Sequence, residues 1–376
     1  MKIATVVGAR PQFIKAAPVG RALREAGHRE ILVHTGQHYD DAMADVFFRE
    51  LRIPEPDFNL GVGSGSHGAQ TGQMLIRLEQ VLVAEGPDWV LIYGDTNSTL
   101  AGALAASKLR IPLAHVEAGM RSYNRVMPEE TNRVIADHVS DLLFTPTRTG
   151  VDNLAREGIT DGVRQVGDVM YDALKMFQPV ALEASRILED LGLRDRPFAL
   201  LTAHRAETVD SDERLSLLLD RVATVELPIV FPAHPRTRKR MEELGLTGRL
   251  PSRIRVIPPV GYLDMLVLES RARLVLTDSG GVQREAFFLS VPSVILRGET
   301  EWPELVEAGA SVLAGERFDA IPRDGFWTAR SVDPGDLFGR GDASRRIVEE
   351  IALFDVSKDA GGAANSMRTS ASSSRH

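Results

Sequence analysis

Acidic side chains in the first half of the chain are of a type that could carry out proton transfer. Carboxylates occur at Asp95, at Glu117 and at the pair Glu129-Glu130, which follows Pro128. Several carboxylates near an anion site are costly unless they move protons or bind hydroxyl groups. The pair after Pro128 also fits the first turn of an ordinary helix, where the helix dipole favours acids. Spacing alone leaves both interpretations of that pair open.

Cations at the ends of predicted strands indicate a local anion site. Pro11 keeps the backbone of Arg10 extended, and Lys15 follows about one helical turn later. His204 and Arg205 hold a similar place in the second half of the chain. Cations gathered in this way suit a diphosphate, because an arginine can bind its oxygens in a bidentate manner.

The string Asp278-Ser279-Gly280-Gly281 stands before a predicted helix and is a second feature suited to phosphate. Glycines let backbone N–H groups approach a phosphate closely, and the start of a helix carries partial positive charge. The Ser279 hydroxyl adds a donor. The same string also fits a helix cap with a tight bend, so on its own it does not decide between the two.

These polar residues lie just beyond the carboxyl ends of predicted strands. Runs of β-branched residues alternate with helical patterns, such as those over 96–108, 212–224 and 282–289, which is typical of βαβ units and parallel sheets. The predicted strands cover residues 3–7, 31–35, 90–93, 113–116, 142–145 and 163–166, then 198–202, 228–231, 254–257, 274–277, 293–296 and 311–313. Open α/β sheets bind ligands outside such strand ends, so two sheets facing each other would line one cleft. Polar loops are nevertheless usual in these folds, and Asp95 and Asp278 could simply cap helices.

Composition excludes several classes of protein. Hydrophobic residues make up 43% of the chain and the formal net charge is −8, which argues against disorder and against a nucleic-acid or anionic-membrane surface. Cysteine is absent, which excludes disulfides, thiolate zinc sites and cysteine nucleophiles. No close His/Asp/Glu cluster has a recognised metal-ligand spacing, and His38 and His115 fit ordinary core or surface positions. No apolar run approaches the roughly 18 residues of a membrane span, and the first one is too short for a signal peptide. We expect a cytoplasmic protein without a metal.

A length of 376 residues is typical of two domains, with the joint expected near 167–178. A helix predicted after Gly341 places Ile347, Ile351 and Phe354 on one face, and this face could pack on either domain. After Lys358 the composition changes to little but Gly, Ala and Ser, so residues 359–376 are predicted to be a disordered tail.

Seven strings of the sequence resemble the UDP-N-acetylglucosamine 2-epimerase family in order and spacing, from Lys2 to about Leu353. They are GARPQFIK (8–15), HTGQHYD (34–40), YGDTNST (93–99), HVEAGMRS (115–122), MPEETNR (127–133), TAHRAE (202–207) and TDSGGVQREA (277–286). The resemblance implies an α/β fold of the GT-B type, in which two Rossmann-like doubly wound domains face an interdomain cleft. It implies an N-terminal domain over 1–168, completed by a crossover helix over 343–356, and a UDP-binding domain over 169–342.

Site residues follow from the same resemblance, position by position. The acid/base carboxylates fall on Asp95, Glu117 and Glu129, and the catalytic histidine falls on His204. The contacts to diphosphate and uridine fall on Arg10, Lys15, Ser279, Gly280, Gly281 and Glu285, where Glu285 would bind the ribose hydroxyls; Arg205 joins them as a cation of the anion site.

Many bacterial members share a second UDP-GlcNAc site through which the substrate activates the enzyme. Gln37 and His234 match residues of that site, whereas Asp40, Gln73 and Ala206 do not. The mismatches remove cationic donors and add a carboxylate, so we expect weak or absent substrate activation.

Three further positions depart from the family pattern. Arg284 stands where many members have an acid, Met265 where many have Phe near the uracil, and Trp302 where many have an arginine. Members with strings like the one at 125–130 include enzymes for modified sugar nucleotides, so substrate identity is less secure than reaction type.

The resemblance implies an epimerase that interconverts UDP-GlcNAc and UDP-ManNAc, by eliminating UDP to give a glycal and then adding it back. No redox cofactor is needed, which agrees with the lack of a complete G-x-G-x-x-G string. The alternatives are a 2-epimerase of a UDP-diacetamido-uronic acid, a hydrolysing UDP-GlcNAc 2-epimerase and a GT-B glycosyltransferase. The acid cluster counts against glycosyl transfer, and also against a sugar-nucleotide binder without catalysis. The expected partners are the UDP-sugar and a second copy of the chain in a homodimer, with no nucleic acid and no membrane.

Overall fold

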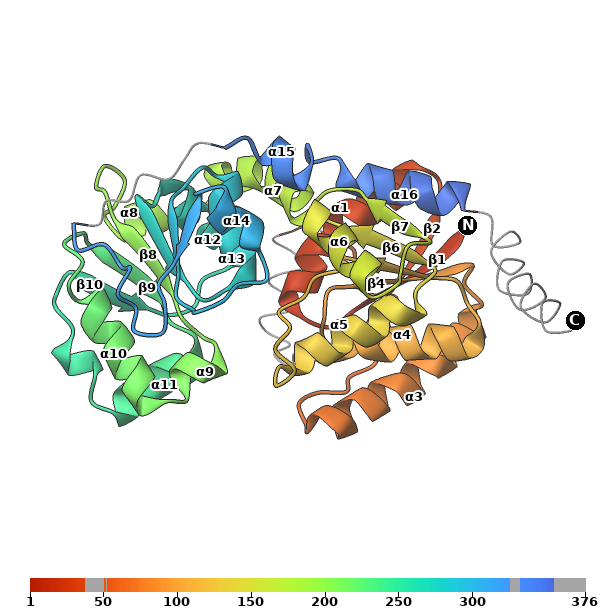
Figure 1. The fold of residues 1–376 in the computed structure, drawn as a ribbon, viewed down its shortest axis with the longest axis horizontal. Coiled ribbons are helices and arrows are strands. Elements are labelled where there is room, and N and C mark those ends of the chain that lie inside the picture. Colours follow the sequence, from red (N-terminus) through yellow and green to blue (C-terminus); the bar gives the residue numbers. More distant parts are fainter. Residues whose placement is uncertain (38–50, 52, 325–331, 355–376) are drawn as a thin grey trace, which may run out of the picture.

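A computed structural model of the chain describes residues 1–37, 51, 53–324 and 332–354, and two parallel β-sheets lie in separate halves of it (Figure 1). In the described part the first sheet has seven strands in the order β3-β2-β1-β4-β5-β6-β7, and the second has six in the order β10-β9-β8-β11-β12-β13. Helices cover both faces of each sheet. The prediction of a GT-B-type fold made of two Rossmann-like, doubly wound units is therefore confirmed.

The first half contains the strands on which the acid cluster depends. Its strands are β1 (Lys2–Val7), β2 (Arg29–His34), β3 (Phe58–Asn59), β4 (Trp89–Tyr93), β5 (Leu113–Val116), β6 (Leu142–Thr145) and β7 (Val163–Gln165). Its helices are α1 (Arg10–Glu25), α3 (His67–Glu85), α4 (Asn97–Leu109), α5 (Pro128–Val139) and α6 (Arg148–Arg156). The central strands β4, β5 and β6 are buried along their whole length, which is typical of a parallel sheet covered on both faces.

The second half repeats this arrangement around the predicted phosphate turn. Its strands are β8 (Ala199–Thr202), β9 (Ile229–Pro232), β10 (Ile254–Ile257), β11 (Leu274–Thr277), β12 (Ser293–Ile295) and β13 (Ser311–Leu313). Its helices are α9 (Ala206–Val209), α10 (Asp212–Val222), α11 (Pro235–Glu243), α12 (Tyr262–Arg271), α13 (Gly280–Phe288) and α14 (Pro303–Glu307), with a 3₁₀ turn at Thr247–Arg249.

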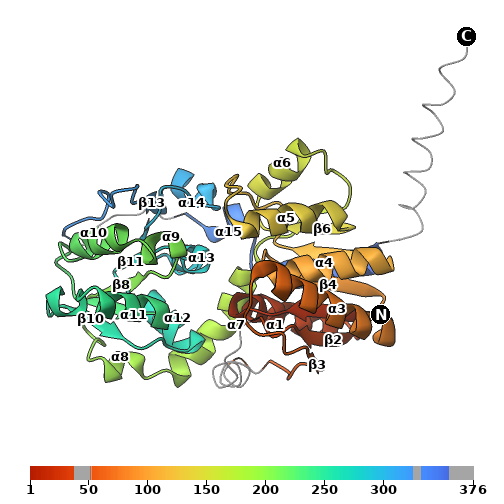
Figure 2. The same cartoon turned by 90° about the horizontal axis from the view of Figure 1, so that it is seen from below.

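The chain crosses between the halves twice, at one place. Helices α7 (Val169–Ala184) and α8 (Ile187–Asp190) lead into the second half, and α15 (Pro334–Phe338) and α16 (Ala343–Leu353) lead back (Figure 1). Seen from below in Figure 2, α7 and α15 lie between the two halves. The two crossing segments touch at Gly167 and Gly339, where a Cβ on Gly167 would lie 2.7 Å from the Phe338 carbonyl oxygen. Both glycines have positive φ angles, of 98° and 79°. A side chain at either position is therefore disfavoured both by the close contact and by the backbone conformation.

Helix α16 lies on the first half, beside α1. Ile347 and Ile351 are buried in the same core as α1, and the Phe354 ring lies 5.4 Å from the Trp89 ring. Asp172 of α7 binds the start of α16, because its carboxylate accepts hydrogen bonds from the backbone N–H groups of Ala343 (3.1 Å) and Ser344 (2.7 Å). The face predicted from the spacing of the apolar residues is thus the one that is buried.

Strand positions were predicted to within one or two residues, apart from β3. This strand has only two residues and pairs with β2 at the edge of the sheet. It is too short to show the alternating pattern of apolar and polar residues that indicates a strand. The predicted tail, 359–376, lies outside the described residues. None of the helices in the described part is long and apolar enough to cross a membrane.

Candidate active site

Both sheets reverse their strand order next to their first strand, and the predicted site residues lie there. Strand β1 lies between β2 and β4, and β8 lies between β9 and β11. Arg10 and Asp95 follow β1 and β4, while His204 and Asp278 follow β8 and β11. Such switch points are where open α/β sheets bind ligands, at the carboxyl ends of the strands.

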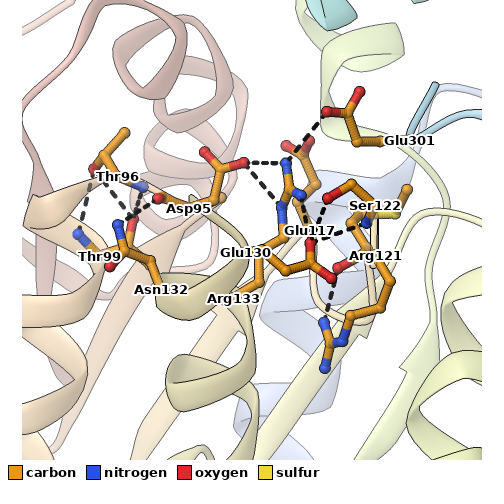
Figure 3. A network of polar contacts seen from close by, with 12 residues as sticks. Asp95, Thr96, Thr99, Glu117, Arg121, Ser122, Glu130, Asn132, Arg133 and Glu301 are labelled. Atoms are coloured by element: carbon orange, nitrogen blue, oxygen red, sulfur yellow. Dashed lines mark hydrogen bonds and ion pairs between the residues drawn. The ribbon is translucent and has the colours of Figure 1, made fainter. Parts of the chain in front are cut away.

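Asp95 forms an ion pair with Arg133 of α5, which donates two hydrogen bonds to one of its carboxylate oxygens (Figure 3). The Arg133 Nε and Nη2 atoms lie 3.0 and 2.6 Å from Asp95 Oδ2. Burial alone would raise the pKa of Asp95, but the charges of Arg133 and Lys15 hold that pKa below its usual value. Asp95 is therefore ionised at neutral pH and is held by a rigid partner.

Glu117 follows β5 and has an unusual backbone conformation. Its φ angle is 72°, a region that costs a non-glycine residue about 1–3 kcal/mol and that occurs preferentially at functional sites. The Glu117 carboxylate forms an ion pair with Lys15 of α1, and Arg284 Nη2 lies 3.4 Å from its other oxygen. Burial would raise the pKa of Glu117, and Arg284 and then Lys15 bring that pKa below its usual value.

A buried network supports the loop that carries Glu117. His115 Nδ1 lies 2.7 Å from Asp137 and its Nε2 lies 2.8 Å from the Gly94 carbonyl oxygen. The His115 ring is thus held between a carboxylate and a carbonyl oxygen, both of which are hydrogen-bond acceptors. The Asp137 carboxylate also accepts hydrogen bonds from Gly119 N–H (3.1 Å) and from Arg121 (2.7 Å).

The adjacent residues Glu129 and Glu130 lie in different environments in the first turn of α5. Glu130 is buried and accepts hydrogen bonds from the backbone N–H groups of Ser122 (2.9 Å) and Tyr123 (2.8 Å). It also lies 3.0 Å from Arg133. Burial would raise its pKa, but these hydrogen bonds and the arginine bring the pKa below its usual value. Glu130 thus holds the loop at 122–123, whereas Glu129, the predicted acid/base residue of the pair, is half-buried.

His204 and Asp278 form a pair at the switch point of the second sheet. His204 Nδ1 lies 3.2 Å from Asp278 Oδ1, and the backbone N–H groups of His204 and Arg205 donate to Asp278 Oδ2 at 2.8 and 2.9 Å. Asp278 is fully buried, which acts to raise its pKa, yet its bonds with His204 and Arg205 bring that pKa below the usual value. Asp278 therefore orients His204 rather than capping a helix.

The string after Asp278 forms the start of α13, as predicted. The Ser279 side chain accepts a hydrogen bond from the Val282 N–H at 3.5 Å, so Ser279 is the N-cap. A Cβ on Gly280 would lie 3.3 Å from Trp302 Nε1, whereas one on Gly281 would meet only the Ser279 hydroxyl, at 3.8 Å. Gly280 thus allows close approach of Trp302, and the helix start keeps the geometry of an anion site.

Glu285 lies on the second turn of α13 and is almost fully buried. Its carboxylate accepts a hydrogen bond from the Tyr262 hydroxyl at 2.8 Å. Burial raises its pKa, and the Tyr262 hydrogen bond and Arg284 only partly oppose this. The ribose hydroxyls assigned to Glu285 would compete with Tyr262 for the same carboxylate.

Further cations gather near His204. Burial, and then the charges of His204, Arg10 and Arg236, lower the pKa of His234. Like charges brought this close favour an anion between them, so the predicted anion site has physical support.

The candidate second site is only partly described. Gln37 accepts hydrogen bonds from the N–H (3.1 Å) and hydroxyl (2.7 Å) of Ser98. Arg77, the cation nearest to the mismatched Gln73, donates to the carbonyl oxygens of Leu60 and Gly61. His38 and Asp40 lie outside the described residues.

Two of the cations that hold the carboxylates, Arg133 and Arg284, were not predicted from the sequence as partners of Asp95 and Glu117. Arg133 is four residues after Glu129 and three after Glu130, a helical spacing that puts all three on neighbouring parts of one helix and could have indicated a pair. Arg284 and Trp302 were noted only as departures, and no local signal links them. No group of three or more His, Asp or Glu side chains suited to a metal occurs in the described part of the chain.

Comparison with a family model gives a match over most of the chain. The model described as UDP-N-acetylglucosamine 2-epimerase matches residues 21–352. A Methanococcus maripaludis protein named as a UDP-N-acetylglucosamine 2-epimerase homolog is 50% identical over 93% of this chain and 99% of its own length. A Pseudomonas aeruginosa protein named UDP-2,3-diacetamido-2,3-dideoxy-D-glucuronate 2-epimerase is 49% identical over 94% of this chain and 99% of its own.

A solved structure agrees with this match. The crystal structure of the Methanocaldococcus jannaschii UDP-GlcNAc 2-epimerase in complex with UDP-GlcNAc and UDP is similar with a TM-score of 0.87 and 44% identity. The similarity covers 94% of this chain and all of that one.

Proposed function

The chain belongs to the UDP-N-acetylglucosamine 2-epimerase family, and we propose that it interconverts UDP-GlcNAc and UDP-ManNAc by eliminating UDP and adding it back. The proton on C2 of the sugar is not acidified by a neighbouring carbonyl group. As a base takes this proton, the C–H electron pair forms a C1=C2 double bond and the C1–O electron pair leaves with UDP. Re-addition returns UDP to C1 and a proton to the opposite face of C2. The reaction is redox neutral, so no redox cofactor is required.

The observation that carries the proposal is that ionised carboxylates and cations from both halves meet at the two switch points. Asp95, Glu117 and Glu129 would supply and remove the proton. A group that transfers a proton in this way contributes about 10²–10⁴-fold to a rate. The proposed substrate contacts are Arg10, Lys15, Arg205, Ser279, Gly280, Gly281 and Glu285, with His204 as the catalytic histidine beside the leaving diphosphate.

Solvent deuterium tests the reaction. In deuterated water, proton NMR of the anomeric signals should show UDP-ManNAc forming from UDP-GlcNAc, with deuterium at C2 of the product and of recovered substrate. Epimerisation without deuterium uptake would exclude proton exchange at C2. Accumulation of free ManNAc with UDP would identify a hydrolysing enzyme instead.

A second substrate is favoured by a specific observation. The Pseudomonas aeruginosa relative, 49% identical, is named for a UDP-diacetamido-uronic acid. The same assay with both UDP-sugars decides the matter: turnover of the uronic acid alone would keep the elimination chemistry and change the substrate.

Domain division and assembly are proposed with the function. We assign residues 1–168 and the crossover helix α16, predicted over 343–356 and described over Ala343–Leu353, to one domain, and 169–342 to the UDP-binding domain. A homodimer is supported by exposed apolar residues two helical turns apart on α3, Ile76 and Val83, at 62% and 65% exposure. Sedimentation of the purified chain tests it. A cytoplasmic location stays a prediction from the sequence.

A further inference from the structure

Arg284 of the second half makes contact with two carboxylates outside its own sheet. Its Nη1 lies 2.6 Å from Asp168 Oδ2, at the start of α7, and its Nη2 lies 3.4 Å from Glu117 Oε1. The side chains of Arg284 and Asp168 are 3% and 1% exposed, and that of Glu117 is 12% exposed. A planar guanidinium can serve two carboxylates at once in a fixed geometry, which the ammonium group of lysine cannot do.

Trp302 fixes the plane of this guanidinium. The Arg284 Cζ atom lies 4.0 Å from the centre of the Trp302 ring, and Arg284 Nε donates to the Gly280 carbonyl oxygen at 3.3 Å. Trp302 is itself buried against Phe338, at a ring separation of 5.8 Å. A desolvated cation stacked in this way on tryptophan is stabilised by the ring as well as by its ion pairs.

The two departures from the family pattern are therefore neighbours in space. The family pattern has an arginine at position 302 and an acid at position 284. In this chain the arginine is at position 284, and it stacks on the tryptophan at position 302. The cation is retained in the site, and its side chain comes from α13.

We propose that Arg284 is a positioning residue that pairs with the Glu117 carboxylate and aims it at the substrate, and that Trp302 holds the Arg284 guanidinium in place. Asp168 anchors the other end of the guanidinium where the chain crosses between the halves. The contact to Glu117 is thus complete when the two halves are together. This inference rests on the proposed function, in which Glu117 is an acid/base group.

Several charged groups face this pair. Lys15 of α1 and Asp95 after β4 face Glu117, and Asp168 and Glu285 face Arg284. An opposite charge in contact lowers a carboxyl pKa by about 1–3 units. One limb of the pH profile of kcat is set by the ionisation of Glu117. Removing Arg284 should thus move that limb to higher pH, by about one unit.

The test compares Arg284→Gln, Arg284→Lys and Asp168→Asn. We expect Arg284→Gln to lower kcat about 10²-fold, with KM changed far less, and to move that limb upward. Arg284→Lys should show a smaller upward shift of the limb than Arg284→Gln does, because lysine keeps the positive charge. Asp168→Asn removes the anchor of the guanidinium but leaves the Arg284 charge beside Glu117, so the limb should move less than in Arg284→Gln while the melting temperature falls. No shift in Arg284→Gln, or a larger shift in Asp168→Asn than in Arg284→Gln, would overturn the proposal.

Trp302 gives a second comparison. Trp302→Phe keeps an aromatic face and should retain kcat within about threefold, whereas Trp302→Leu should lose about tenfold, as expected when a desolvated cation–π contact is removed. Equal kcat values for the two variants would show that the ring does not position Arg284.

A measurement independent of turnover separates this inference from the proposed function. Urea unfolding of Glu117→Gln, Arg284→Gln and the double variant forms a double-mutant cycle. A contact predicts that Arg284→Gln destabilises the chain less when Glu117 is already replaced. A wild-type chain inactive on both UDP-sugars with this coupling intact would refute the proposed function alone. An active wild-type chain with additive effects would refute the Arg284 contact alone.

Discussion

Glu129 and Glu130 are adjacent in α5, and exchanging each for glutamine should separate catalysis from stability. Glu130→Gln keeps the size of the side chain but removes its charge. A glutamine can present only one acceptor oxygen, so one of the backbone donors at Ser122 and Tyr123 is left facing an NH₂ group. Arg133 also loses one of its ion-pair partners and keeps Asp95.

The magnitude follows from these contacts. A hydrogen bond to a charged group contributes about 1.5–3 kcal/mol, and a buried donor without a partner costs about 1–3 kcal/mol. Because the glutamine keeps part of these bonds, we expect Glu130→Gln to lower the free energy of unfolding by about 3 kcal/mol. For domains of this size that corresponds to a melting temperature lower by about 6–12 °C. Turnover of the folded variant should remain within a few-fold of wild type.

Glu129→Gln should show the opposite pattern. It removes the proposed acid/base group, so kcat should fall about 10²-fold or more. Its side chain is half-buried and contributes mainly a first-turn acid to α5, about 0.3–1 kcal/mol, so melting should change little. Thermal melts and kcat, measured well below the Glu130→Gln transition, compare the two. A large loss of kcat in Glu130→Gln beside a fully active Glu129→Gln would refute the assignment.

A pH series adds an internal check on Glu130. A carboxyl whose pKa is lowered in the folded state stabilises the fold above its unfolded pKa, about 4.3, and loses this contribution as pH falls through the folded value. The difference in melting temperature between wild type and Glu130→Gln should therefore narrow below about pH 4.3. A constant difference down to strongly acidic pH would show that the charge of Glu130 is not what stabilises the loop.

Two other predictions follow from the same site. Lys15 is paired with Glu117 and is proposed to contact the diphosphate, so substrate binding should raise the pKa of Glu117. The limb of the pH profile that Glu117 governs should therefore lie at higher pH in kcat than in kcat/KM, and Lys15→Met should remove that difference. Two charge-assisted hydrogen bonds are lost at the second UDP-GlcNAc site, so its affinity for UDP-GlcNAc should be about a hundredfold weaker. Rates should then depend hyperbolically on the UDP-GlcNAc concentration. A lag in UDP-ManNAc conversion that traces of UDP-GlcNAc abolish would contradict this.

The strands and the place of the site were accessible from the sequence because both depend on local patterns. Strands such as β10 and β11 have the predicted bounds, since short runs with β-branched residues between polar or proline residues are typical of strands in an α/β chain. Parallel strands end at one edge of a sheet, so residues that follow neighbouring strands, such as Asp95 after β4 and Glu117 after β5, had to come together.

Backbone conformation and partner choice were not accessible in this way. Nothing in the string HVEAGMRS shows that Glu117 has a positive φ angle, because that conformation is imposed by the surrounding contacts, including the Glu117 and Ala118 N–H bonds to the Phe144 carbonyl oxygen. Likewise, sequence spacing left the roles of Glu129 and Glu130 open. The loop at 122–123, which folds back over α5, decides between them.

The environment of Glu117 shows why single positions are a poor guide to this site. Its ion-pair partners, Lys15 and Arg284, come from α1 and α13, which are far apart in the sequence and belong to different halves. Each matched string predicts the local structure of its own residues. The electrostatic environment of the Glu117 carboxylate, however, depends on side chains from other strings that the fold brings into contact with it. An arginine missing from position 302 is therefore not a missing charge, since Arg284 fills the space beside Trp302. A departure in one string has to be weighed together with the residues that the fold places against it.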